Sequence, residues 1–67
     1  MAVARVTEIS ATSTKSFEDA VKQGLDRATK TLRNVKSAWI KEHRVSLEND
    51  KVAEFQVNMQ ITFVLED

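Results

Sequence analysis

The chain has 67 residues, with ten basic and ten acidic side chains, no Cys, no Pro and a single Gly. The balanced charge argues against a nucleic-acid-binding domain, which needs an excess of Lys and Arg to neutralise phosphates, and the lack of Cys excludes disulfides and the common Cys-containing zinc sites. Because chains below about 70–80 residues rarely bury enough apolar surface to be stable alone, we expect copies of this chain to associate.

The first half of the chain predicts a strand followed by a helix. Residues 3–10 are rich in β-branched side chains, which are typical of a strand. Residues 17–35 place apolar side chains at the i, i+3, i+4 spacing of one helix face and predict a helix of about five turns. Ser16 and Asp19 resemble a capping box with Asp in place of Glu. Gly24 costs this helix roughly 1 kcal/mol relative to Ala, so we expect another element to pack closely against it.

The second half predicts a hairpin. Residues 53–65 alternate apolar and polar side chains, the period of two of a strand with one buried face. Residues 37–47 alternate less cleanly and lead into the polar tetrad 48–51, which suits a tight turn. With a right-handed crossover, the first strand lies parallel to the second and beyond the third. We therefore predict an α+β fold of order β-α-β-β, a three-stranded antiparallel sheet with its third strand central and one helix packed on one face.

The expected register places the only Trp on the face away from the helix. A turn centred on residues 49–50 pairs residues whose numbers sum to 99, so Trp39 opposes Gln60 and His43 opposes Gln56; opposed residues share a face. A strand of about 43 Å also overhangs a helix of about 27 Å. Such exposed surface is an aggregation hazard unless it is covered. Trp39 is therefore either buried in a subunit interface or a stacking platform for a planar ligand.

The remaining polar residues offer little chemistry. His43 is the only imidazole and has no Ser, Cys or carboxylate at a nucleophile–base spacing, so it is interpreted as a surface or interface residue. Glu48 and Asp50 lack the glycine-punctuated spacing of a calcium loop and are interpreted as turn residues. There is no glycine-rich phosphate loop. We predict no catalytic residue, no metal site and no enzymatic activity.

The order β-α-β-β in fewer than 70 residues resembles the dodecins, small flavin-binding proteins that assemble into hollow dodecamers. Residues 11–13, Ala-Thr-Ser, open the predicted helix and are similar to the Gly-Thr-Ser of that family. Residues 27–33 resemble its helix end, and residues 55–57 and 63–66 resemble its last strand. The similarity runs through the whole chain without a gap and implies a single dodecin-like domain over residues 1–67.

The resemblance also implies a cofactor site. In the family, a Trp on the second strand stacks on the flavin, a Gln on the third strand contacts the ring edge, and bacterial members carry an Arg near the flavin phosphate. Gln56 matches that Gln and Arg44 matches that Arg. The position of the family's Trp falls on Ser37, whereas Trp39 lies two residues further on, on the same face but about 6.6 Å along the strand. The amide of Gln60 adds a second group for the ring edge.

Two functions follow from these positions. The resemblance implies a non-catalytic storage or sequestration protein, a homododecamer whose partners are its own copies and a flavin (FMN, riboflavin or FAD). The alternative is a dodecin-like shell that has lost flavin binding and has a structural or another ligand- or ion-binding role. No apolar run approaches the roughly 18 residues of a membrane span, and the N-terminus lacks the pattern of a signal peptide. We expect a cytoplasmic protein without nucleic-acid or membrane partners.

Overall fold

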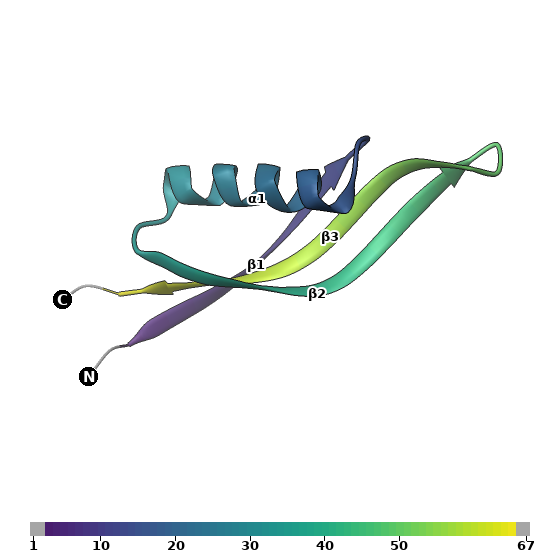
Figure 1. Ribbon diagram of the computed structural model, residues 1–67. Coiled ribbons are helices and arrows are strands. Elements are labelled where there is room, and N and C mark those ends of the chain that lie inside the picture. Colours follow the sequence, from purple (N-terminus) through teal and green to yellow (C-terminus); the bar gives the residue numbers. More distant parts are fainter. Residues whose placement is uncertain (1–2, 66–67) are drawn as a thin grey trace.

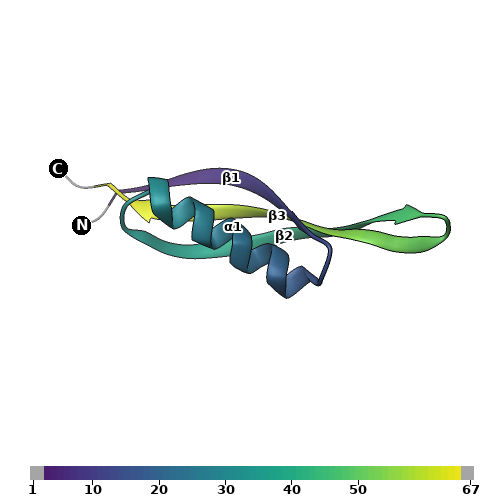
Figure 2. The same cartoon turned by 90° about the horizontal axis from the view of Figure 1, so that it is seen from above.

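The computed structural model describes residues 3–65, in which four elements follow one another: β1 (Ala4–Ser13), α1 (Phe17–Thr31), β2 (Val35–Glu48) and β3 (Lys51–Val64) (Figure 1). The strands of this range form one sheet of order β1-β3-β2, and both edge strands run antiparallel to β3. Helix α1 lies obliquely across one face (Figure 2). The predicted β-α-β-β fold with a central third strand is confirmed. Residues 1–2 and Glu66, the last residue of the C-terminal family motif, lie outside this range.

The helix ends earlier than its apolar pattern predicts. It stops at Thr31 instead of residue 35, because Leu32 is extended (φ −104°, ψ 140°) and only its N–H still bonds back to the Ala28 carbonyl, at 2.9 Å. Asn34 then takes a left-handed conformation with φ 59°. Leu32 in the connection and Val35 at the start of β2 continue the apolar spacing because both pack against the core.

The first strand is longer than predicted and runs to Ser13, so residues 11–13 end β1 and do not open the helix. Ser13 is buried, accepts a hydrogen bond from the Lys15 N–H at 2.9 Å and donates to Asp19 Oδ2 at 2.6 Å. Ser16 caps the helix, as predicted, by accepting from the Asp19 N–H at 3.0 Å. The Asp19 carboxylate therefore ties the strand end to the helix start.

The core lies between α1 and the central strand. Its members, at most 5% exposed, are Ala20, Ala28, Val57, Met59 and Ile61. Gly24 faces this layer, and a Cβ there would overlap the Met59 Cε and lie 3.1 Å from the Ala11 Cβ. The close packing predicted at Gly24 is confirmed: the helix approaches the sheet at the one position without a side chain.

The β2–β3 hairpin extends past the start of α1, as its length predicted (Figure 1). Its turn residues Asn49 and Asp50 are both left-handed, with φ 52° and 64°, a combination typical of the type I′ turn that matches strand twist. The molecule measures 51 × 19 × 13 Å, so the hairpin makes it long and thin.

The hairpin has the predicted register beside the turn and again from Ser37 to Ile40, whereas a skip at Lys36 pairs Val35 with Phe63. Leu47 opposes Val52 near the turn and Trp39 opposes Gln60 near the far end, both as predicted. Between them the ladder skips Ala53 on β3 and then Lys41 on β2, two irregularities that cancel each other.

Within this shifted segment the predicted pairing of His43 with Gln56 is wrong. His43 opposes Val57, a buried residue that faces α1, and Arg44 opposes Gln56. Side chains alternate between the faces of a strand, so a one-residue slip moves each of them to the other face. His43 therefore lies on the helix side of the sheet.

Candidate functional site

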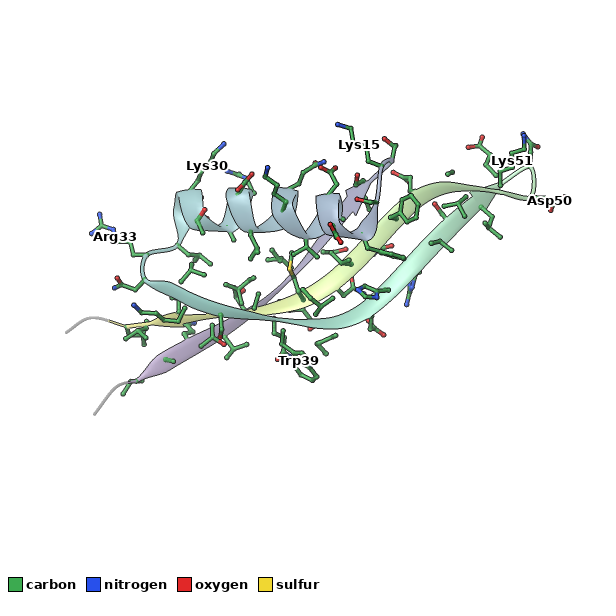
Figure 3. All side chains as sticks on the ribbon, viewed as in Figure 1. Lys15, Lys30, Arg33, Trp39, Asp50 and Lys51 are labelled. Carbon is green, nitrogen blue, oxygen red and sulfur yellow. The ribbon has the colours of Figure 1, made fainter. Side chains whose placement is uncertain are left out.

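The face of the sheet opposite α1, which we call the outer face, carries the Trp. Trp39 projects from β2 away from the helix (Figure 3), and its side chain remains 62% exposed. Gln60 lies directly opposite on β3, as predicted. Ser37, which the sequence resemblance predicts to be at the family's Trp position, lies opposite Thr62 on the same face and is therefore a neighbour of Trp39. The arrangement offers an indole surface with an amide beside it.

The irregularity at Lys41 brings a second pair of groups to the outer face. In an unbroken register Arg44 would oppose Phe55 and face the helix, whereas the skipped residue places it opposite Gln56. Gln60 lies four positions after Gln56 along β3, which corresponds to about 13 Å. The outer face thus has an indole and an amide at one point, and a guanidinium and an amide about 13 Å away.

Polar side chains connect the three strands between these two points. Gln56 Nε2 donates to Ser10 Oγ on β1 at 2.9 Å and to Asn58 Oδ1 at 3.3 Å. Asn58 Nδ2 donates in turn to Glu42 Oε1 on β2 at 2.8 Å. Both of these Gln56 bonds use the side-chain nitrogen, so neither of them occupies the side-chain oxygen.

Lys41 and Glu8 are outer-face residues that the sequence reasoning missed. The Lys41 Nζ lies 3.5 Å from both carboxylate oxygens of Glu8 on β1, so this ion pair crosses the central strand. The same nitrogen lies 6.0 Å from the centre of the Trp39 ring, at the outer limit of a cation–π contact. A charge pairing of this kind has no sequence signal, since the register slip decides which side chains meet.

His43 takes no part in the outer face. Its ring centroid lies 4.6 Å from that of Phe17 at the start of α1, and Phe17 also meets Phe55 edge-on at 5.1 Å. These three rings cover the hairpin where it emerges from under the helix. Glu48 ends β2 and Asp50 lies in the turn.

Two searches of residues 3–65 bear on other kinds of function. No three or more His, Cys, Asp or Glu side chains gather there as a metal-binding group. No helix in that range is long and apolar enough to cross a membrane.

The chain is similar in sequence and in structure to proteins of one known family. The family model described as Dodecin matches residues 3–66. A curated dodecin from Thermus thermophilus is 35% identical over 65 residues, which cover 97% of this chain and 94% of that protein. The structure of dodecin from Streptomyces coelicolor superposes with a TM-score of 0.94 at 33% identity, covering 98% of this chain and 94% of that one.

A third relative is similar in fold alone. The calcium-chelating antigen called calcium dodecin, from Mycobacterium tuberculosis, has a TM-score of 0.83 at 22% identity, covering 96% of this chain and 91% of that one. Its structure is described as having a novel calcium-binding site.

Proposed function

The chain belongs to the dodecin family, and on that premise we propose that it is a non-catalytic flavin-binding protein whose copies assemble into a hollow dodecamer. The observation that carries this proposal is the outer face, where an exposed indole and a guanidinium lie on the same side of the sheet. Both groups would be held by the sheet itself, because each projects from a paired strand.

The chemistry of the outer face fits a flavin. Isoalloxazine is a flat ring with a polar edge, and the Trp39 indole provides a stacking surface of the kind that aromatic rings prefer. The amide of Gln60 lies beside that surface and suits the ring edge. The Gln56 carbonyl can accept a hydrogen bond, and the Arg44 guanidinium suits a phosphate because its donors form a planar fork. The separation of about 13 Å is shorter than an extended flavin mononucleotide.

The proposed activity is storage and protection. A bound flavin brings its own redox chemistry and photochemistry, and the groups on the outer face bind and orient it. The indole, the two amides and the guanidinium offer neither a nucleophile nor a general base at the pH of a cell, and the carboxylates of Glu8 and Glu42 are engaged by Lys41 and Asn58. Two copies that close over the outer face would exclude water from the ring and hold flavins between their Trp39 side chains, which quenches the excited state.

Titration of riboflavin and FMN with the protein, followed by flavin fluorescence, tests the proposal. We expect strong quenching that is lost in Trp39→Ala and kept in Ser37→Ala, a matched control two residues away on the same strand face. Arg44→Ala should weaken FMN binding by about tenfold or more and leave riboflavin binding unchanged, because a charge-assisted hydrogen bond contributes about 1.5–3 kcal/mol. Flavin fluorescence unchanged at micromolar protein would contradict flavin binding.

The second candidate function is a shell of the same architecture that binds no flavin. The observation that favours it is Ser37, which occupies the family's Trp position, with the indole one strand pleat away on Trp39. The calcium site described for the Mycobacterium tuberculosis protein indicates that this fold also accommodates ions. An assembled protein that leaves flavin fluorescence unchanged and binds calcium in a calorimetric titration would support this function over the first.

A further inference from the structure

Two segments toward opposite ends of the molecule carry opposite charge. Residues 27–36, at the end of α1 and the start of β2, include four basic side chains and no acidic one, whereas residues 48–54 at the hairpin tip include three acidic side chains and one basic one. Figure 3 shows Lys30 and Arg33 at one end and Asp50 at the other. The chain as a whole has no net charge, so this is a separation of charge along a molecule 51 Å long.

The acidic tip is also apolar on one side. Leu47 and Val52 oppose each other beside the turn, and they are 64% and 49% exposed. Val45, on the same side of β2, is 41% exposed. These side chains continue the helix-facing side of the sheet past Phe17, the first residue of α1. The ribbon of the hairpin extends beyond the helix there (Figure 1).

A groove beside the basic segment combines apolar side chains with a positive charge, the complement of the apolar and acidic hairpin tip. A hollow of about 530 Å³ runs between α1 and the edge strand β1. Its apolar lining includes Ile9, Ala11 and Leu32, and Gly24 lies where the helix comes close to the sheet at the side of this groove. Arg27, one of the four basic residues of segment 27–36, also lines the groove.

We infer that the hairpin tip of one copy docks in the α1–β1 groove of the next copy. Leu47 and Val52 cover the apolar lining, and Glu48 and Asp50 face the basic side chains around Arg27. This inference rests on the proposed assembly and assigns two of the surfaces that build it. Tip and groove are different surfaces at opposite ends of the chain, so the contact is heterologous, and a chain of such contacts forms a ring when its rotation closes.

Charge reversal at the two surfaces, followed by sedimentation velocity over a range of concentrations, tests this docking. Glu48→Lys and Arg27→Glu should each raise the dissociation constant of the assembly by about tenfold or more, because each change brings like charges together across the contact. The double variant should recover most of the loss because the pair is restored with exchanged signs. Lys22→Glu is the matched control: it changes the charge of an exposed α1 residue outside the groove lining, and the assembly should keep its dissociation constant.

Leu47→Gln tests the apolar part of the docking. The side chain is exposed in the single copy, so the variant should fold, with an unchanged circular dichroism spectrum, and assemble more weakly. If the wild type assembles and Glu48→Lys, Arg27→Glu and Leu47→Gln all assemble equally well, the docking is wrong and the proposed dodecamer stands. If the wild type sediments as a folded monomer at micromolar concentration, the dodecamer itself is wrong and the docking with it.

Discussion

At the scale of single residues, hydrogen bonds and skipped positions decide which side chains can act together. Arg44 reaches the outer face because the ladder skips Lys41, and Lys41 itself pairs with Glu8 beside Trp39. Asp19 shows the same dependence on neighbours at the start of the helix. The hydrogen bonds from Ser13 and then Gln23 lower the pKa of its carboxyl group, because both donors favour the charged form.

The lowered pKa of Asp19 predicts a loss of stability in acid. A carboxyl group whose pKa is lower in the folded state stabilises the fold above its unfolded pKa, about 3.9, and the stabilisation disappears as the pH falls through the folded pKa. The difference in unfolding temperature between the wild type and Asp19→Asn should therefore be constant above about pH 5 and shrink below about pH 4.

The Ser13→Ala variant is the companion to this measurement. It removes the hydrogen bond that contributes most to the lowered pKa of Asp19. In that background the additional change Asp19→Asn should cost less stability at neutral pH and vary less with pH. If the difference in unfolding temperature between the wild type and Asp19→Asn does not change from pH 7 to pH 3, the role given to Asp19 is wrong.

At the scale of elements, the distance between α1 and the sheet is set at one position of the helix, Gly24. The helix approaches the sheet over Gly24, where the Met59 and Ala11 side chains occupy the space that a larger residue would need. The apolar face of the helix explains why it packs on the sheet, and Gly24 explains how closely it does so.

Gly24→Val should lower the free energy of unfolding by about 1–3 kcal/mol, because overpacking forces side chains of a filled core out of place. Lys22→Val is the control, because it introduces the same β-branched side chain at an exposed position of the same helix, where no overlap with the sheet results. This control should lower the free energy of unfolding by only a few tenths of a kcal/mol. Chemical denaturation at one fixed protein concentration measures both. Equal costs for the two variants would show that the packing at Gly24 is loose.

At the scale of the whole molecule, the chain leaves much apolar surface open. Five residues of the described range form its buried apolar core, while Trp39 on the outer face and Leu47 at the hairpin tip are both more than half exposed. A long, thin shape exposes more surface for its volume than a compact one, so a single copy gains little from burial. Neighbouring copies are the simplest source of the missing contacts.

This shape predicts that stability depends on concentration. When folding is coupled to assembly, the unfolding temperature rises with protein concentration by mass action. The unfolding temperature should therefore rise by several degrees over a hundredfold increase in concentration, and Leu47→Gln should lower it at every concentration without removing the slope. Differential scanning calorimetry provides the measurement, and an unfolding temperature independent of concentration would contradict coupled assembly.

The sequence by itself determined the order of the elements and the position of the Trp. The period of two in residues 53–65, the helical spacing that begins at Phe17 and the polar tetrad 48–51 are local patterns, and local patterns specify a strand, a helix and a turn. Trp39 could be placed on the outer face because the skips at Ala53 and Lys41 cancel, which restores the predicted pairing at Trp39. Gly24 could be identified as a close contact because the cost of a glycine inside a helix needs a compensation.

Only the tertiary structure decided which groups share the outer face with Trp39. Strand side chains alternate between faces at every residue, so the skip at Lys41 exchanges the faces of His43 and Arg44. Nothing in residues 37–47 marks where this skip occurs. The helix end was likewise decided by packing, since Leu32 continues the apolar spacing from an extended backbone. The periodicity of the sequence indicates which side chains are buried. The three-dimensional pairing of the strands decides which partners those side chains pack against.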